Sequence, residues 1–403
     1  MSKLNPPKFR AIVVGAGPVG LYLAHALSKA GIDYLIFEQH DSVLRHQGAG
    51  ILIYPHTLRL LDQIGLYDKA DDHIINRNMT DLLVRNGKVI NSSPLWSKLG
   101  ERTGATVVDI ETHEKGAKVH LRDGSIEECS IVIGVDGVYS KTRQIMQRIA
   151  QTPPDIWPMT AAYQGLYGCF DSSCGLEPGT FYQSRGTGIV TQVMAKENRG
   201  YFAILRAISP TAEPKRYTTE SRDCLAEELA NIVVAPGVHF KDLWGLTVKD
   251  TAVMVNQEEG YCDSWYHGRI VLVGDAVHKF TSVTGMGANI GINAAAALAN
   301  ELYRALQSDP NPRTERIEDA FKRYQDIRDR EARRLHTLGR MQIRGVTWST
   351  WSDWFFDRFV NPWIGVNKWA DLIGKLIKKG QILEYVPFED REVQVPWVYT
   401  SAA

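Results

Sequence analysis

Three glycines at positions 15, 17 and 20, in the order G-x-G-x-x-G, constrain this chain more than any other feature. They lie in the stretch 9–39, FRAIVVGAGPVGLYLAHALSKAGIDYLIFEQ, where an apolar run precedes them and a helical pattern and a second apolar run follow. This order predicts a strand, a helix and a second strand that ends at Glu38. In such a βαβ unit Gly15 permits the tight turn, Gly17 lets the backbone approach a pyrophosphate, and Gly20 lets helix and strand pack closely.

An acidic residue at the end of the second strand strengthens this interpretation. Glu38 can accept hydrogen bonds from a ribose 2′-hydroxyl, and the N-terminus of the helix offers free N–H groups to phosphates. A glycine triplet also occurs in tight turns that bind no ligand, and this alternative stays open. The complete frame, with an acid about 20 residues beyond the glycines, favours a dinucleotide-binding unit.

Composition limits the remaining possibilities. The chain has 403 residues, of which 44% are apolar and 23% charged, so we expect a globular protein of two or three domains. Its 46 basic and 46 acidic residues give no indication of a nucleic acid partner. Five cysteines without a C-x-x-C pair predict reduced thiols in a cytoplasmic protein. We expect neither a signal peptide nor a transmembrane helix.

A second polar turn follows another apolar run, Ile131 to Val135. Asp136 and Gly137 come directly after this run, and Ser140 and Arg143 follow them. This order places an acid where a buried strand ends, a position at which a cofactor can lie. An ordinary strand–turn–helix connection, in which Ser140 caps the helix, explains the same residues equally well.

A third motif, GDAVHKFTSVTGMGAN, begins at Gly274, directly after the apolar run Arg269 to Val273. Asp275 can bind sugar-like hydroxyls, and the loop with Gly285 and Gly287 lets the backbone approach a flat ligand. The alanine-rich run that follows predicts a long helix, whose N-terminus carries a positive dipole.

The histidines show no metal-binding pattern. His56 and His73 lack partners at metal spacing, and we expect both at the surface or in loops. His278 lies three residues after Asp275, but no further ligands stand near it. No metal site is therefore predicted.

Several further elements are expected from periodicity and turn residues. Helices are predicted at Pro55 to Ile64, Glu220 to Ile232 and Glu315 to Gly339, and hairpins at Thr80 to Ile90 and Ala117 to Ser130. One antiparallel sheet is predicted from the runs Ala161 to Phe170, Gly179 to Gln183, Gly188 to Ala195 and Arg199 to Ile208.

The segment 346–379 differs from the rest of the chain because it combines many aromatic residues with lysines. The aromatic residues are Trp348, Trp351, Trp354, Phe355, Phe356, Phe359, Trp363 and Trp369. They precede Lys375, Lys378 and Lys379 in an amphipathic pattern that is typical of peripheral membrane contact. The alternative is a tail that packs on the body of the protein or on a partner subunit.

With three motifs in this order, the chain resembles the FAD-dependent monooxygenases of the para-hydroxybenzoate hydroxylase type (group A). GAGPVG with Glu38 matches their ADP-binding motif, and GVDGVYSKTR, residues 134–143, matches the motif that contacts FAD and NAD(P)H. The motif at 274–289 matches the one that holds the ribityl chain and pyrimidine edge of the flavin. DAVHKFT and the ending ILEYVPFEDREVQVPW resemble the fungal secondary-metabolism branch, which epoxidises or hydroxylates prenylated aromatics, meroterpenoids and indole alkaloids.

This resemblance implies a cofactor, a reductant and a reaction. FAD would be bound, NAD(P)H would reduce it, and one oxygen atom of O₂ would pass to a small-molecule substrate. The residues implied to contact FAD are Gly15, Gly17, Gly20, Glu38, Gly48, Asp136, Gly137, Arg143, Gly274, Asp275, Gly285, Gly287 and Ala288. Tyr201 falls near a tyrosine that the branch uses beside the substrate, and it is the candidate catalytic residue.

The implied architecture is an α/β fold with interleaved domains. A Rossmann-like FAD-binding domain is expected at 1–79, 105–154 and 262–340, an antiparallel-sheet substrate domain at 80–104 and 155–261, and a Trp-rich helical tail at 341–403.

The chain departs from the family pattern in four places. A helix-length segment with an FAD-contacting arginine is missing at 104–105, and Arg102, which precedes this gap, is not expected to replace that arginine. Leu52 replaces a glycine near the flavin, Gln164 a cationic active-site residue and Ser282 a proline. These departures leave open a protein that has lost redox chemistry and acts as a cyclase, isomerase or inactive scaffold. A flavin dehydrogenase or oxidase is a third possibility, which the Asp-Gly motif disfavours.

Overall fold

The N-terminal βαβ unit forms the middle of a six-stranded sheet in the computed structural model, which describes residues 8–43, 51–67, 82–84, 101–152, 159–171, 175–196, 199–389 and 396–399. In order across this first sheet, the strands are β17 (Tyr266–His267), β18 (Ile270–Leu272), β9 (Ile131–Gly134), β1 (Arg10–Val14), β2 (Asp33–Phe37) and β5 (Glu101–Arg102). Neighbours from β18 to β5 run parallel, and β17 is antiparallel at the edge. β18 and β9 are buried along their whole length, as expected for parallel strands with both faces covered.

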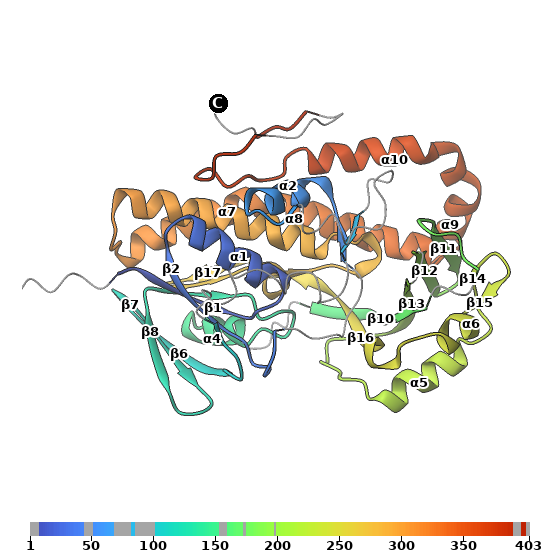
Figure 1. Ribbon diagram of the computed structural model, residues 1–403, viewed down its shortest axis with the longest axis horizontal. Helices are drawn as coiled ribbons and strands as arrows, with labels where there is room; N and C mark the ends of the chain where they lie inside the picture. Colours follow the sequence, from blue (N-terminus) through green and yellow to red (C-terminus); the bar gives the residue numbers. More distant parts are fainter. Residues whose placement is uncertain are drawn as a thin grey trace, which may run out of the picture.

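Helices cover this sheet. α1 (Pro18–Lys29) packs against the long helix α7 (Gly287–Ser308), and α7 packs against α8 (Thr314–Val346). Figure 1 shows α7 and α8 running side by side along the molecule. α1 and α7 approach closely because Gly291 has no side chain, and a Cβ there would lie 2.6 Å from Val19 Cγ2.

A small antiparallel sheet precedes the second motif in the chain, and one helix begins within that motif. Its strands are β6 (Val107–His113), β7 (Gly116–Leu121) and β8 (Ile126–Cys129), and the helix α4 (Lys141–Ile149) contacts β6. β7 and β8 pair antiparallel across residues 122–124, which confirms the predicted hairpin.

The predicted antiparallel sheet is also confirmed. In order, the strands of this second sheet are β11 (Phe181–Gly186), β12 (Ile189–Ala195), β13 (Gly200–Thr211), β10 (Met159–Phe170), β16 (Val253–Tyr261) and β19 (His278–Lys279). One face is covered by α5 (Thr219–Glu228) and α6 (Phe240–Gly245), which bury an aromatic cluster that includes Phe170 and Phe202. The other face packs on Val283 of the 3₁₀ turn η4 (Ser282–Thr284) and on the end of α8. Two-residue β19 comes from the third sequence motif, so it ties that motif to the second sheet.

The shortened segment at 104–105 returns the chain to the first sheet. β5 has two residues and pairs with the end of β2, and the N–H of Ala105 donates to the carbonyl of Glu38 at 2.8 Å. The Arg102 guanidinium binds Asp123 at 2.6 Å and Glu127 at 3.3 Å in the β7–β8 region. Residues 101–102 thus pair with the first sheet, although they lie in the range 80–104 that we assigned to the second domain; the domain boundaries stay a prediction.

The C-terminal region is helical, as predicted. α8 is followed by α9 (Trp351–Phe355), the π-helical turn η5 (Phe356–Val360) and α10 (Asn361–Ile377). α10 lies in the upper right part of the view in Figure 1. The chain then returns to the body. Leu383 is fully buried, and its N–H and carbonyl bind the side chain of Gln63 at 2.7 and 3.0 Å.

That return explains one wrong prediction. His56, expected at the surface, is only 4% exposed in α2 (Pro55–Gln63). A Cβ on Gly380 would lie 2.4 Å from the His56 Cβ, so the C-terminal segment covers the histidine. Sequence spacing could not indicate a cover that comes from more than 300 residues away. His73 lies outside the described residues.

Two further expectations concern strands and cysteines. Of the hairpin predicted at Thr80 to Ile90, the described part is β4 (Leu82–Val84), and it pairs with β3 (Ile51–Ile53). β14 (Val233–Ala235) and β15 (Val238–His239) form a separate two-stranded sheet.

The cysteines within the described ranges, at 129, 169, 224 and 262, are free thiols. No helix in the described part of the chain combines the length and apolarity needed to cross a membrane.

Candidate cofactor site

The carboxyl ends of four parallel strands bring the three sequence motifs to one edge of the first sheet. The register places Val14, Phe37, Gly134 and Leu272 in one row across β1, β2, β9 and β18. Each motif begins within two residues of the end of its strand, so the motifs converge although they are far apart in the sequence. Open α/β sheets bind their ligands at this edge.

Two glycines of the triplet have no room for a side chain, and the third has free space beside its backbone. Gly15 has a φ of 110°, and a Cβ there would lie 2.5 Å from the carbonyl oxygen of Val135. A Cβ on Gly20 would lie 2.0 Å from the carbonyl oxygen of Gly15. A Cβ on Gly17 would meet nothing within 4 Å, and no side chain caps α1. The backbone at Gly17 and the N-terminus of α1 therefore present the open, positively polarised surface that a pyrophosphate requires.

Glu38 is held against this loop. Its side chain accepts hydrogen bonds from the N–H groups of Ala16 at 2.9 Å and His40 at 3.0 Å, and the residue is 8% exposed. An ionised carboxylate has about four acceptor positions, so two remain for ribose hydroxyls. The structure thus fixes the carboxylate beside the glycine loop, and its contact with a ribose stays a prediction.

Asp136 stabilises the start of α4. Its carboxylate accepts hydrogen bonds from the Ser140 hydroxyl at 2.5 Å and from the N–H and hydroxyl of Thr142 at 2.9 and 3.0 Å. Ser140 in turn caps α4 by accepting from the N–H of Arg143 at 2.9 Å. These contacts form the strand–turn–helix connection that was the alternative interpretation. A Cβ on Gly137 would meet nothing within 4 Å, so a ligand can still approach the backbone of this turn.

Arg143 joins the second motif to the third. Its guanidinium donates to the carbonyl of Val138 at 2.7 Å and to that of Ala276 at 2.8 Å, and the residue is 1% exposed. Burial lowers the pKa of this guanidinium. In the described structure Arg143 therefore links two turns, and its contact with FAD stays a prediction.

Asp275 lies in the 3₁₀ turn η3 (Gly274–Ala276), and its side chain is 35% exposed. Its Oδ2 accepts a hydrogen bond from Lys279 Nζ at 2.6 Å. Burial alone would lower the pKa of Lys279, but Asp275 and, to a smaller extent, Glu258 raise it overall. Asp275 thus carries a fixed cationic partner and keeps acceptor positions for ribityl hydroxyls.

In the loop before α7, Leu52 lies against Gly285, whereas Gly287 has free space beside its backbone. A Cβ on Gly285 would lie 2.7 Å from Leu52 Cδ2, so the leucine that replaces the usual glycine lies on this residue. Asn289 holds the contact together, because its Nδ2 donates to the carbonyls of Leu52 at 2.7 Å and Gly285 at 2.9 Å. A Cβ on Gly287 would meet nothing within 4 Å, and no side chain caps α7. The open backbone position in this loop is therefore Gly287, and contact of Ala288 with FAD stays a prediction.

Ser282 binds this loop to the second sheet. Its N–H donates to Gln257 Oε1 at 2.9 Å, and its hydroxyl lies 2.5 Å from that of Tyr167. Gln192 also donates, to the carbonyl of Val283 at 3.0 Å. The proline that is usual at position 282 has no N–H and cannot make the first contact. Serine at this position therefore suits the docked loop.

Tyr201 lies on the face of the second sheet that the loop contacts. It pairs with Cys169 in the register of β10 and β13, and side chains alternate along a strand, so it shares the face of Tyr167. Tyr201 is 8% exposed. Gly48 lies outside the described residues, so the structure does not place it.

Gln164 lies on the other face of that sheet. The hydroxyl of Tyr217 donates to Asn256 Oδ1 at 2.8 Å and to Gln164 Oε1 at 3.4 Å. Gln164 is separated by odd numbers of residues from Tyr163 and Tyr167, which contact the loop side. Gln164 pairs with Asn256 and so shares the face of β16 that carries Glu258, and its position relative to the substrate stays a prediction.

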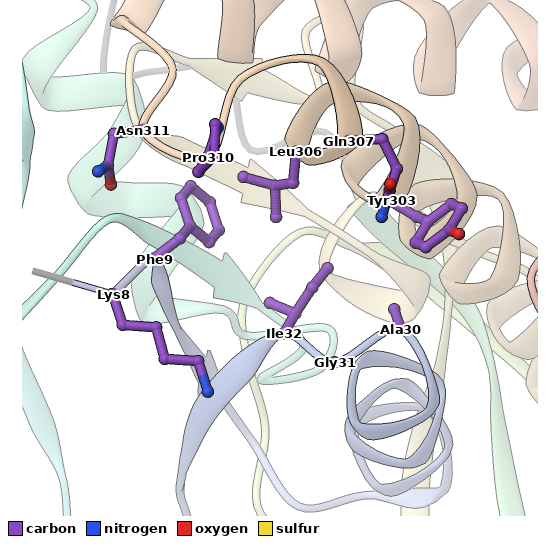
Figure 2. Close-up of a pocket in the computed structure, with 10 residues that line it drawn as sticks. All are labelled: Lys8, Phe9, Ala30, Gly31, Ile32, Tyr303, Leu306, Gln307, Pro310 and Asn311. Atoms are coloured by element: carbon purple, nitrogen blue, oxygen red, sulfur yellow. The ribbon is translucent and has the colours of Figure 1, made fainter. Parts of the chain in front are cut away.

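A cavity of about 490 Å³ lies at the opposite end of the first sheet. Figure 2 shows Phe9, Ile32 and Leu306 around the same space, with Lys8 and Asn311 at its edge. Phe9 and Ile32 precede β1 and β2, so this cavity is at the amino ends of the parallel strands and is separate from the cofactor site. Among the described residues, no group of three or more His, Cys, Asp or Glu side chains could hold a metal ion.

Comparison with known proteins decides the family. The sequence model described as FAD binding domain matches residues 8–121 and 101–335. The FAD-dependent monooxygenase srdH of Neurospora crassa is 39% identical, over 96% of this chain and 98% of its own length. The chain belongs to the FAD-dependent monooxygenases. The FAD-dependent monooxygenase spyC of Aspergillus fumigatus is 30% identical, over 96% of this chain and 89% of its own length.

This FAD-dependent monooxygenase also has the expected fold. A single-residue variant of HpxO from Klebsiella pneumoniae, solved with FAD, superposes with a TM-score of 0.74 at 19% identity, over 92% of this chain and 98% of that one. The predicted family, α/β fold, enzyme class and FAD cofactor are confirmed. The relatives are named as monooxygenases, so the redox interpretation is favoured over a cyclase or scaffold.

The comparisons also bear on the shortened segment of this monooxygenase. The two matches to the family model overlap at 101–121, so the family pattern breaks in this interval. The alignment with srdH extends over 440 positions, more than the 403 residues of the whole chain. The relative therefore has residues without counterparts here, in agreement with a missing segment at 104–105.

Some residues near the site were not singled out by the sequence motifs. Tyr139 and Lys279 lie inside two of the motifs, but only their contacts distinguish them from other motif positions. Gln257 and Glu258 lie in β16, where the sequence has no motif. Their relation to the site depends on how the second sheet packs against the third motif.

Proposed function

We propose that this monooxygenase uses NAD(P)H and O₂ to epoxidise or hydroxylate an aromatic or prenylated secondary metabolite in a fungal biosynthetic pathway. The observation that carries the proposal is the convergence of three motifs at one sheet edge in a chain 39% identical to srdH. FAD, when bound, supplies electron transfer and the activation of O₂. The protein binds and orients the reactants and excludes water.

The open positions of the site support a division of roles. Gly17 and the N-terminus of α1 would hold the pyrophosphate, Glu38 the adenosine ribose and Asp275 the ribityl hydroxyls. The backbone at Gly287 and Ala288 would bind the edge of the flavin ring. At these positions the structure offers either a glycine whose Cβ side is open for at least 4 Å or a carboxylate with further acceptor positions.

The face of the second sheet that carries Tyr201 supports an apolar substrate. Its buried residues Tyr163, Tyr167, Val190 and Leu205 are aromatic or aliphatic, and they pack on Val283 of η4 and on Ile343 and Val346 of α8. Such a surface suits a prenylated or aromatic ring system better than a charged metabolite. We expect Tyr201→Phe to lower turnover while FAD stays bound, and an unchanged turnover number would remove Tyr201 from the reaction.

Peripheral contact with a membrane is the second part of the proposal. Five aromatic side chains of α9, η5 and α10 are between 43% and 88% exposed: Trp351, Phe355, Phe356, Phe359 and Trp363. Arg358 and Lys375 are exposed on the same elements, and Lys379 is exposed just after α10. Ile373, Leu376 and Ile377 face the body. Exposed aromatic rings beside basic residues suit the interface of an anionic bilayer.

Sedimentation with lipid vesicles tests this contact. The double variant Trp351→Ser/Trp363→Ser should lose binding to vesicles that contain phosphatidylserine, while Phe181→Ser, which removes a 39% exposed ring from the second sheet, should not. A wild-type chain that does not sediment with such vesicles, or that forms a dimer lost in the double variant, would favour a partner subunit as the cover.

The catalytic proposal is tested on the purified protein. We expect a flavin absorbance spectrum and oxidation of NADPH or NADH that accelerates when a prenylated aromatic substrate is added. With ¹⁸O₂, the product should gain one labelled oxygen atom. A colourless protein that converts a metabolite without reductant or O₂ would instead support the non-redox alternative.

A further inference from the structure

Lys279 stands between two carboxylates that come from different parts of the fold. Its Nζ lies 2.6 Å from Asp275 Oδ2. In the antiparallel pair of β19 and β16, Lys279 lies opposite Gly260. Glu258 precedes Gly260 by two residues, so it projects from the same face and is a diagonal neighbour of Lys279. The lysine is therefore placed between Asp275 of the third motif and Glu258 of the second sheet.

Glu258 extends this arrangement to the second motif. It is 5% exposed, and its Oε1 accepts a short hydrogen bond from the hydroxyl of Tyr139. Burial and, next to it, the Glu258 carboxylate raise the pKa of Tyr139, so the phenol keeps its proton and remains a donor. A buried carboxylate needs partners of this kind, because its desolvation is otherwise costly. Asp275, Lys279, Glu258 and Tyr139 thus form one polar chain across the boundary between the sheets.

We propose that Lys279 is a positioning residue for FAD, which orients the Asp275 carboxylate, and that Glu258 holds Lys279 in this place. A residue of the second sheet thereby sets the affinity of a cofactor bound on the first. The inference rests on the proposed role of Asp275 toward the ribityl hydroxyls. Without the lysine, Asp275 loses the hydrogen bond that fixes the orientation of its carboxylate, and Glu258 loses a neighbouring cation. A carboxylate that is free to rotate is less well prepared to accept from a ribityl hydroxyl.

The dissociation constant of FAD, measured by fluorescence titration, tests the role of the lysine. We expect Lys279→Met to weaken FAD binding about tenfold, the usual effect of losing one hydrogen bond to a charged group. Lys279→Arg keeps the charge and should restore most of the affinity. If Lys279 acts through Asp275, the Lys279→Met change should have no further effect in an Asp275→Asn background.

A matched pair of glutamates tests the contribution of the second sheet. Glu258→Gln should weaken FAD binding severalfold, because the lysine loses its second counter-charge. Glu259→Gln is the control: Glu259 is equally buried, but it projects from the opposite face of β16 and binds Arg344 at 3.0 Å. The FAD affinity of the Glu259→Gln variant should match that of the wild type. Melting temperatures of all variants separate an effect on FAD from a loss of folding.

Three results would overturn the inference. Unchanged or tighter FAD binding by Lys279→Met would mean that the lysine has no positioning role or competes with FAD for Asp275. An additive loss in the Asp275→Asn background would mean that Lys279 acts independently of this carboxylate. Equal effects of Glu258→Gln and Glu259→Gln would reduce both to general stability. A wild-type chain that binds no FAD would contradict the proposed function itself, whereas these results arise only when the wild type binds FAD.

Discussion

The carboxylate of Glu38 accepts a hydrogen bond from the backbone N–H of Ala16 at 2.9 Å. This contact joins the end of β2 to the middle of the glycine triplet, so the protein itself fixes the positions that would hold the ribose and the pyrophosphate. A site arranged before its ligand arrives loses less conformational entropy on binding.

Glu38→Ala should weaken FAD binding and lower stability together. The change removes two hydrogen bonds to backbone N–H groups, of Ala16 and His40, and we expect a loss of about 1–3 kcal/mol in the free energy of unfolding. Urea unfolding without added FAD measures the first effect, and fluorescence titration measures the second. Glu38→Gln, which keeps one acceptor oxygen, should have a stability and an FAD affinity between those of the wild type and Glu38→Ala. If Glu38→Ala is as stable as the wild type, the loop does not depend on this carboxylate.

The glycines of the triplet should separate stability from binding. Gly20→Ala brings a Cβ to 2.0 Å from the Gly15 carbonyl, and we expect a loss of about 3 kcal/mol or more. Gly17→Ala meets no protein atom within 4 Å, and its backbone, at φ −70° and ψ 176°, suits alanine. It should therefore keep the melting temperature but bind FAD at least about tenfold more weakly. Full FAD affinity in Gly17→Ala would place the pyrophosphate elsewhere.

Asp275→Ala should abolish FAD retention, because the ribityl hydroxyls lose their charged acceptor. The same change leaves Lys279, whose side chain is 24% exposed, without its ion-pair partner. The absorbance spectrum of the purified variant measures the bound flavin. A variant that elutes with full flavin absorbance would contradict the role of this carboxylate.

The stability of the protein should fall as the pH drops below about 6.5, in part because of His278. Burial lowers the pKa of His278 to about 4, and this imidazole, 1% exposed, stacks on Phe280 with ring centroids 5.2 Å apart. In the unfolded chain this histidine binds a proton at about pH 6.5. Its contribution to the free energy of unfolding is therefore complete above that pH, and up to about 3 kcal/mol is lost as the pH falls from about 6.5 to about 4. His56, whose pKa burial lowers to about 3, acts in the same direction.

His278→Phe measures the share of this residue. Neither ring nitrogen of His278 has a hydrogen-bond partner in the described structure, so phenylalanine loses no contact there. Urea unfolding at about pH 7 and about pH 5 should show a smaller decrease for the variant than for the wild type. Equal decreases would assign the acid sensitivity to other groups.

Removing residues 346–403 should destabilise the whole protein as well as remove the exposed aromatic rings. The deleted part includes the buried Leu383 and the partly buried Tyr385, and the hydroxyl of Tyr385 donates to the carbonyl of Ala26 at 2.8 Å. We expect a lower melting temperature or insoluble expression, because α1 and α2 lose part of their cover. A truncated chain as stable as the full one would show that this return segment contributes little, and the serine variants of Trp351 and Trp363 are the cleaner test of membrane contact.

The sequence alone predicted the parts of the fold that depend on near neighbours along the chain. The βαβ unit, the hairpin at residues 122–124 and the strands of the second sheet follow from hydrophobic period and turn residues, which act over a few positions. The motif order also indicated the family correctly, and the positions of the motifs at strand ends allowed their convergence to be expected.

Tertiary structure decided which side chains meet once these elements pack. Asp136 and Arg143 bind the turns around them, Leu52 covers Gly285, and the C-terminal segment buries His56. Lys279 lies between Asp275 and Glu258 only because β19 pairs with β16 in one particular register. Such contacts join residues far apart in the sequence, and they depend on register and burial, which no local pattern of residues contains.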